Sequence, residues 1–140
     1  MQTYLLILND PPYGTERSYN GLRLAASLSK RDGESVKVFL IGDAAACAKK
    51  DQKVPPGYYN VEVMLRGPAR QGAEILVCGT CMDARGIAET ELAEGAKRGT
   101  LEQLQVTPLT RTELIVGKLL PFVVIGYVQL TLTLVLMVFL

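Results

Sequence analysis

The sequence predicts an α/β fold, a parallel sheet with helices on both faces, followed by one C-terminal transmembrane helix. Two observations predict the sheet: short apolar runs alternate with stretches of helical periodicity, and each apolar run stops at turn-forming residues. A third predicts the membrane helix, because no charged residue follows Lys118. The 140 residues, 49% hydrophobic and 21% charged, suffice for one small domain. We therefore expect an α/β domain over residues 1–105, a junction over 106–118 and a membrane helix over 119–140.

The elements of the domain follow from these patterns. Tyr4–Leu8 is an apolar run that stops at two prolines and a glycine, as a buried parallel strand does. After it, Leu24, Ala25 and Leu28 recur at helical spacing. In chain order we expect a strand over 4–8, a helix over 16–31, a strand over 36–41, a helical start over 44–50, a short helix over 60–66 that Pro68 ends, and a strand over 75–77. Right-handed crossovers place the helices on both faces of the sheet.

Three loops follow the predicted strands, and chemistry in parallel sheets gathers at this carboxyl edge. They cover residues 9–14, 42–45 and 78–83. The third begins with Cys-Gly-Thr-Cys, which places the thiols of Cys78 and Cys81 at a strand end. Nearby backbone N–H groups and Arg85 favour the thiolate form, whereas the charge of Asp83 opposes it. Cys47, in an alanine-rich stretch, is expected to be a core thiol.

Composition excludes several classes of function. Lys and Arg number 15 and Asp and Glu 14, so a net charge of +1 gives no support for a nucleic-acid partner. The chain has no histidine and three cysteines, too few ligands for a four-coordinate zinc site, and we expect no metal. The N-terminus lacks the basic and long apolar regions of a secretory signal, so we expect the cysteines to stay reduced in the cytosol.

Four separated blocks carry a resemblance to a known family. They are Asn9–Ala25, Gly42–Ala44, Gly57–Asn60 and Cys78–Gly86. In this order they resemble the YchN-type branch of the DsrE/DsrF-like sulfur-relay family, over residues 1 to about 105. The resemblance implies a compact α/β subunit that assembles into homo-oligomers, often trimers or hexamers. It also implies intracellular sulfur transfer between donor and acceptor proteins.

The same resemblance assigns roles to individual residues. It implies that Cys78 is the reactive cysteine and Cys81 the second thiol of a sulfurtransferase-like reaction, which passes through a Cys78 persulfide and needs no cofactor. The residues expected to shape this site are Asn9, Asp10, Tyr13, Gly14, Asp43, Thr80, Asp83 and Arg85. Asp10 and Asp43 could equally cap helices.

The C-terminal segment predicts a different environment. A helix of roughly 20 apolar residues crosses a bilayer core, and residues 119–140 carry no charge. Arg111 and Lys118 precede this segment, so we expect a cytoplasmic N-terminal domain that is membrane-associated through its C-terminus. Past about Gly99 we expect the sequence to leave the sulfur-relay family, because residues from about 99 to 140 are similar to the cytoplasmic approach and following membrane helix of type-2 ABC exporter permeases.

Three alternatives to a persulfide relay follow. The chain could be a fragment of an ABC-type exporter permease with a passenger domain. It could be a dithiol redox protein, since a Cys-x-x-Cys pair suits reversible disulfide formation as well as sulfur transfer. It could also be a non-catalytic oligomeric module whose cysteines are structural.

Overall fold

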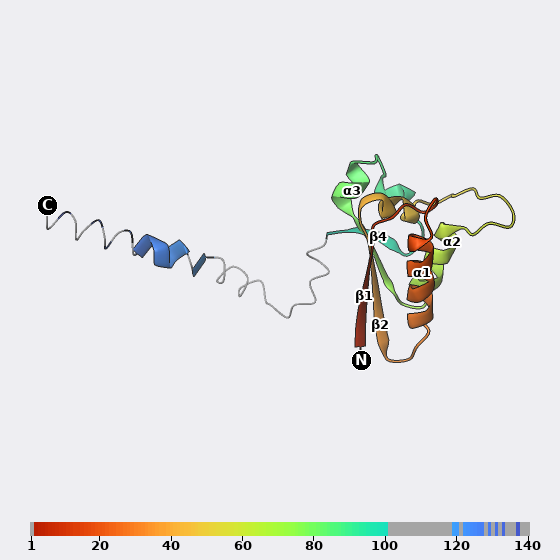
Figure 1. Cartoon of the computed structure of the whole chain (residues 1–140), viewed down its shortest axis with the longest axis horizontal. Helices are drawn as coiled ribbons and strands as arrows, with labels where there is room; N and C mark the ends of the chain where they lie inside the picture. The colour runs from red at the N-terminus through yellow and green to blue at the C-terminus, as the bar shows by residue number, and fades with distance from the viewer. Residues whose placement is uncertain are drawn as a thin grey trace. The chain divides into compact units, whose positions relative to one another are not determined.

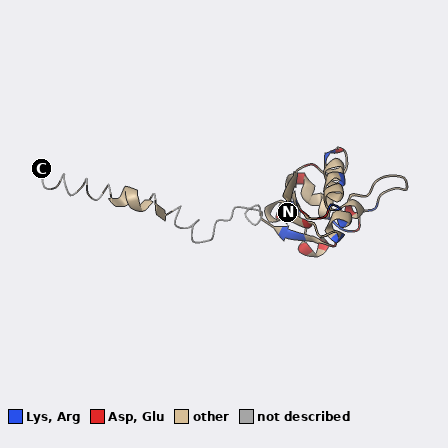
Figure 2. Cartoon of the chain, turned by 90° about the horizontal axis from the view of Figure 1, so that it is seen from below, with Lys and Arg blue, Asp and Glu red and all other residues tan. Residues whose placement is uncertain are grey.

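The computed structural model describes residues 2–100 and, in the C-terminal segment, residues 119–120, 122–127, 129, 131, 133 and 137. The chain divides into two compact units, Met1–Leu104 and Gln105–Leu140. In the first unit, acidic and basic positions are interspersed along the ribbon (Figure 2). This agrees with the nearly balanced charge of the sequence.

A four-stranded parallel sheet forms the centre of the first unit (Figure 1). Its strands are β1 (Gln2–Leu8), β2 (Glu34–Leu40), β3 (Glu74–Cys78) and β4 (Ala96–Gly99), in the spatial order β1-β2-β3-β4. The register pairs Leu8 with Leu40, Leu40 with Val77, and Cys78 with Gly99. The carboxyl ends of the strands therefore meet at one edge, and the predicted parallel sheet is confirmed.

Two helices pack side by side against one face of this sheet (Figure 1). They are α1 (Arg17–Leu28) and α2 (Val61–Arg70). Two shorter helices follow strand ends, the 3-10 helix η1 (Gly42–Ala48) after β2 and α3 (Gly79–Asp83) after β3, and the 3-10 helix η2 (Glu89–Glu91) precedes β4. Alternate strand residues meet the helices, so that Val38, Leu40 and Val77 share a fully buried core with Leu22 and Leu65.

The prediction of helices on both faces holds, within residues 2–100, for one face only. Right-handed crossovers that always step in the same direction along the sheet place every connection on the same side, and the order β1-β2-β3-β4 never reverses. Met82 of α3 accordingly joins the same core as α1 and α2. The opposite face carries the separate buried pair Phe39 and Leu76, and on β1 the exposed Leu5 and Ile7.

Two element predictions were wrong. The helix expected to end before Pro68 continues to Arg70, because the missing N–H of Pro68 removes only one hydrogen bond and its carbonyl still accepts from Gln71 and Ala73. Strand β4 was not predicted at all. Its sequence, Ala-Lys-Arg-Gly, contains no apolar run, since its two basic side chains are exposed.

The described residues of the C-terminal segment are helical. The hydroxyl groups of Thr131 and Thr133 donate to the carbonyls of Tyr127 (2.9 Å) and Gln129 (2.8 Å), one turn earlier. Among the described residues, no helix has both the length and the apolar character needed to cross a bilayer. The predicted span over 119–140 includes residues outside the described set, and the predicted junction over 106–118 lies entirely outside it.

Candidate thiol site

The two thiols of the Cys-Gly-Thr-Cys motif lie where β3 passes directly into α3. Cys78 is the last residue of the strand and the residue before the helix, with extended backbone angles (φ −58°, ψ 117°). Cys81 lies inside α3 and not in a loop before it, which corrects the sequence prediction. Cys78 packs against Phe39 and Leu76 on one side of the sheet, whereas Cys81 packs against the core on the helix side. The motif therefore places one sulfur on each side of the strand end.

Hydrogen bonds favour the ionised form of Cys78, whose side chain is partly exposed. Its sulfur lies 3.2 Å from the hydroxyl oxygen of Thr80. Desolvation raises the pKa of the Cys78 thiol, but hydrogen bonds from the Thr80 hydroxyl, the Cys81 thiol and the backbone N–H groups of both residues outweigh it, so that the pKa falls below the usual 9.0. This combination of access and lowered pKa is typical of a reactive cysteine.

Cys81 is held by the loop that follows β2. The backbone N–H of Gly42 donates to the Cys81 sulfur over 3.1 Å. Gly42 adopts a positive φ of 61°, a conformation that glycine adopts without steric cost. The hydrogen bond from Gly42 to Cys81 therefore joins the predicted loop after β2 to the predicted loop after β3.

Asp43 and Arg85, both predicted site residues, lie together at the second thiol. The Arg85 guanidinium donates to the Asp43 carboxylate over 2.6 Å and to the Cys81 carbonyl over 3.1 Å. The hydrogen bond to Asp43 chiefly raises the pKa of Arg85, and the charges of Cys81 and Cys78 contribute. The side chain of Asp43 pairs with Arg85, and η1 has no side-chain cap, so the helix-capping alternative fails for this residue.

Arg98 is a site residue that the sequence did not predict. Its guanidinium binds the Asp83 carboxylate through two hydrogen bonds, 2.8 and 2.6 Å long. It also lies against Gly79, where a Cβ atom would come within 2.8 Å of the Arg98 Nε. The hydrogen bonds from Arg98 lower the pKa of Asp83. The charge of Asp83, expected to oppose the thiolate, is thus paired with a cation beside Cys78.

The third cysteine is chemically different. Cys47 is fully buried in the core, as predicted, and its thiol lies 3.8 Å from the backbone carbonyl of Asp10. Burial raises the pKa of Cys47 to about 11, although a hydrogen bond from Ser18 acts in the opposite direction. Cys78, in contrast, combines solvent access with a lowered thiol pKa.

The first predicted loop reaches the thiol site only through its beginning. The carbonyl oxygen of Asn9 lies beside Gly42, 3.5 Å from where a Cβ atom would be. The Asp10 carboxylate instead accepts from Thr15 (3.2 Å) and pairs with Arg17 (3.4 Å), which orders its own loop. Tyr13 and Gly14 line a different cavity, described below.

No metal centre emerges from the described residues, among which no three His, Cys, Asp or Glu side chains are grouped to hold an ion. The arrangement at Cys78 and Cys81 can support thiolate chemistry with two neighbouring sulfurs and two flanking guanidinium groups. The fold and site together define a class: a small parallel α/β domain with a paired thiol at a strand end.

Comparison with known proteins identifies the family. The sequence model of the DsrE/DsrF-like family matches residues 2–116, so the chain belongs to this family. Protein YchN of Escherichia coli K12 is 36% identical over 105 residues, which cover 74% of this chain and 89% of YchN. An uncharacterized protein of Methanopyrus kandleri is 38% identical over 99 residues, covering 71% of this chain and 80% of the relative.

Solved structures agree with this assignment. The crystal structure of E. coli YchN superposes with a TM-score of 0.64 at 35% identity, covering 74% of this chain and 89% of that one. A protein of unknown function from Methanobacterium thermoautotrophicum shares the fold, with a TM-score of 0.57 at 12% identity, over 74% of this chain and 86% of that one. The resemblance seen in the four sequence blocks is therefore confirmed at the level of family and fold.

The boundary of the family likeness differs from the prediction. We expected the sequence to leave the family past Gly99, but the family match continues to residue 116. The family match thus includes the first part, residues 99–116, of the stretch that we expected to resemble an exporter permease. The comparisons give no support for a permease segment.

Proposed function

We propose that this protein is an intracellular sulfurtransferase-like relay that carries a sulfur atom on Cys78. The observation that supports this most directly is the lowered pKa of a partly exposed thiol at a strand end, beside a second thiol. Membership of the DsrE/DsrF-like family is consistent with a sulfur-relay domain. The roles of Cys78 and Cys81 are our assignments.

The proposed reaction consists of two balanced exchanges. The Cys78 thiolate attacks the outer sulfur of a donor persulfide, R–S–SH, which breaks the donor S–S bond, releases R–S⁻ and forms Cys78–S–SH. The thiolate of an acceptor then attacks the same outer sulfur, takes it as a new persulfide and regenerates the Cys78 thiolate. Neither step needs an external oxidant or reductant, because the sulfur keeps its oxidation state throughout.

The surrounding groups fit the charges of this reaction. A thiolate exists before the first step and after the second, and a persulfide is itself ionised readily. The Thr80 hydroxyl lies within hydrogen-bond distance of the Cys78 sulfur, and Arg98 and Arg85 place positive charge nearby. We assign the two arginines as positioning residues, each held by a carboxylate, that stabilise negative charge on sulfur.

The test is sulfur loading of the full chain. We expect that treatment with a low-molecular-weight persulfide adds the mass of one sulfur atom to the peptide that contains Cys78, and that cyanide or a thiol removes it. Cys78→Ser should abolish loading, and Cys47→Ser, which removes the buried thiol, is the matched control. Equal loading of wild type and Cys78→Ser would refute the proposal.

A dithiol redox function is the second candidate, favoured by one observation. The Cys81 thiol is within hydrogen-bonding reach of Cys78, and such pairs can form a disulfide. Cys81→Ser separates the two candidates, because it eliminates an internal disulfide but leaves Cys78 able to hold a persulfide. If Cys81→Ser loses all sulfur transfer and wild type cycles between dithiol and disulfide instead, the redox function replaces the relay.

Two further properties are proposals. We expect a homo-oligomer, a trimer or hexamer, which light scattering on the purified chain measures. We also propose membrane attachment through residues 119–140, supported by the absence of charge in that segment. Flotation of the full chain with lipid vesicles tests it, and Val124→Lys, which introduces a charge in the segment, should abolish flotation. If wild type does not float, the attachment is refuted.

A further inference from the structure

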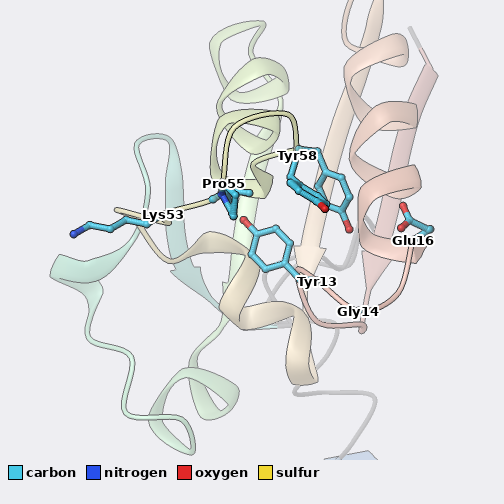
Figure 3. A pocket seen from close by; sticks show the side chains of 8 residues that line it. Tyr13, Gly14, Glu16, Lys53, Pro55 and Tyr58 are labelled. Carbon is cyan, nitrogen blue, oxygen red and sulfur yellow. The ribbon is translucent and has the colours of Figure 1, made fainter.

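A cavity lined by tyrosines lies away from the thiols, between the β1–α1 loop and the loop that precedes α2 (Figure 3). Its volume is about 430 Å³, comparable to a small-ligand site. We call it the tyrosine pocket, and its principal lining residues are Tyr13, Glu16, Lys53, Pro55, Tyr58 and Tyr59. None of these residues takes part in the reaction proposed for Cys78.

The aromatic walls of the tyrosine pocket are held in place by the fold. The Tyr13 hydroxyl donates to the side-chain oxygen of Gln52 over 2.6 Å and accepts the backbone N–H of Val61 over 3.3 Å. The Tyr59 ring packs between two others, with centroids 5.8 Å from Tyr13 and 4.5 Å from Tyr19. Tyr58 is 74% exposed and contributes a ring that is free to contact a ligand.

The Glu16 carboxylate places a negative charge beside the tyrosine rings that line the pocket. Within residues 2–100, the Glu16 carboxylate forms no ion pair, since the neighbouring Arg17 pairs with Asp10 at 3.4 Å, and it makes no cap hydrogen bond to α1. Burial first, and then the charge of Glu16, raises the pKa of Tyr59. Figure 3 shows that the side chain of Lys53, although it belongs to the lining, extends away from the rings of Tyr13 and Tyr58.

The same ring cluster already accepts a cation of this chain. The guanidinium carbon of Arg23 lies 5.5 Å from the centroid of the Tyr19 ring, which packs against Tyr59. Cations are attracted to the faces of aromatic rings, and clusters of such rings bind ammonium groups. An unpaired carboxylate beside them adds a charge of the complementary sign.

From this geometry we propose that the tyrosine pocket binds an organic cation, an ammonium or guanidinium group on an apolar stem. The charged end lies between the tyrosine rings and the Glu16 carboxylate, and the stem contacts Val54 and Pro55. A lysine or arginine side chain of a protein and a free amine share this chemistry. An anion would meet the carboxylate, and a neutral apolar group would gain nothing from it.

Binding is tested by titrating the full chain with capped amino acids and recording the NMR chemical shifts of isotope-labelled tyrosine rings. The probes are Nα-acetyl-lysine-N-methylamide and its arginine counterpart. The neutral control is Nα-acetyl-norleucine-N-methylamide, and the acidic control is the glutamate analogue. We expect saturable shifts with the two basic probes only. Equal binding of the norleucine probe, or preferential binding of the acidic probe, would overturn the proposal.

Variants locate the site. Glu16→Gln and Tyr58→Ala, both at exposed positions, should each weaken the lysine probe by about twofold to fivefold. Asp32→Asn is the matched control, an exposed carboxylate in the turn beyond the far end of α1, and it should leave the affinity unchanged. If Glu16→Gln binds as wild type does, the proposal fails, whether or not Cys78 carries sulfur.

A second arm distinguishes the source of the cation. A Gly-Gly-Lys-Gly-Gly peptide that binds more tightly than the capped lysine indicates a protein chain as the ligand. A simple alkylammonium ion that binds as well as the peptide indicates a free amine. Both results support the cation site, whereas the absence of binding by peptide, capped residue and alkylammonium ion refutes it.

Discussion

The contrast between Cys78 and Cys47 predicts a large difference in reactivity within one chain. Burial raises the pKa of Cys47 to about 11, so at pH 8 about one Cys47 in 1,000 is ionised. A thiol with an ordinary pKa of 9.0 would be ionised about 100-fold more often, and hydrogen bonds lower the pKa of Cys78 from that ordinary value. A less basic thiolate is a weaker nucleophile, which offsets roughly tenfold of the advantage that the ordinary thiol has over Cys47. We therefore expect Cys78 to react faster than Cys47 by a factor on the order of ten from ionisation alone.

Burial increases the difference further, since Cys47 has no exposed surface. The assay is timed alkylation of the native full chain with iodoacetamide, followed by mass spectrometry of the cysteine peptides. A denatured sample is the control, in which both cysteines should react at similar rates. If native Cys47 is alkylated as fast as Cys78, or if Cys78 is inert, the assignment of Cys78 as the nucleophile is refuted.

Three other predictions follow from the same contacts. Thr80→Val removes a hydrogen bond to the Cys78 thiolate, so the pH profile of Cys78 alkylation should move to higher pH; an unchanged profile would contradict the role of the hydroxyl. Arg98→Met leaves the Asp83 carboxylate without its two hydrogen bonds from Arg98 and should slow the alkylation of Cys78 at pH 8. Adding Asp83→Asn should restore part of the alkylation rate, and a double variant as slow as Arg98→Met would exclude the charge of Asp83 as the cause of the slowing. The raised pKa of Cys47 stabilises the folded state below about pH 9, and this contribution is lost as the pH rises towards 11, by about 3 kcal/mol in total. Chemical unfolding at several pH values should show that Cys47→Ala lacks this alkaline decline.

Much of the fold could be predicted because three of the four strands have continuous apolar sequences. The runs over 4–8, 36–41 and 75–77 became β1, β2 and β3 with shifts of one or two residues at their ends. Strand β4 could not be predicted in this way, because at the edge of the sheet its Lys97 and Arg98 side chains remain exposed. The sheet order was equally hidden, since alternation of strands and helices is the same whether successive crossovers step in one direction or reverse.

The two thiols of the candidate site can be located from the sequence, but the residues distant in sequence that contact the site cannot. The Cys-x-x-Cys motif and the turn after β2 are local patterns, and both were found. The pairing of Arg98 with Asp83 depends on the β3–β4 register, which sets Arg98 opposite Val77. Likewise, the contact between Gly42 and Cys81 joins residues 39 positions apart, and no residue pattern around position 81 indicates it.

The two thiols lie at the sheet edge because β3 ends at Cys78 and α3 begins at Gly79. The strand order β1-β2-β3-β4 does not reverse anywhere in the sheet, so the site does not depend on such a reversal. Side chains alternate along a strand, so Val77 enters the core with the helices while Cys78 points to the other face. The helix begins at the next residue, and its turn returns Cys81 to the helix side, where the Gly42 N–H binds its sulfur. The Gly42 hydrogen bond holds the Cys81 sulfur on the helix side, whereas accepting a sulfur atom requires only that Cys78 be accessible. This arrangement is the reason why we propose sulfur transfer through Cys78 in preference to cycling of the pair.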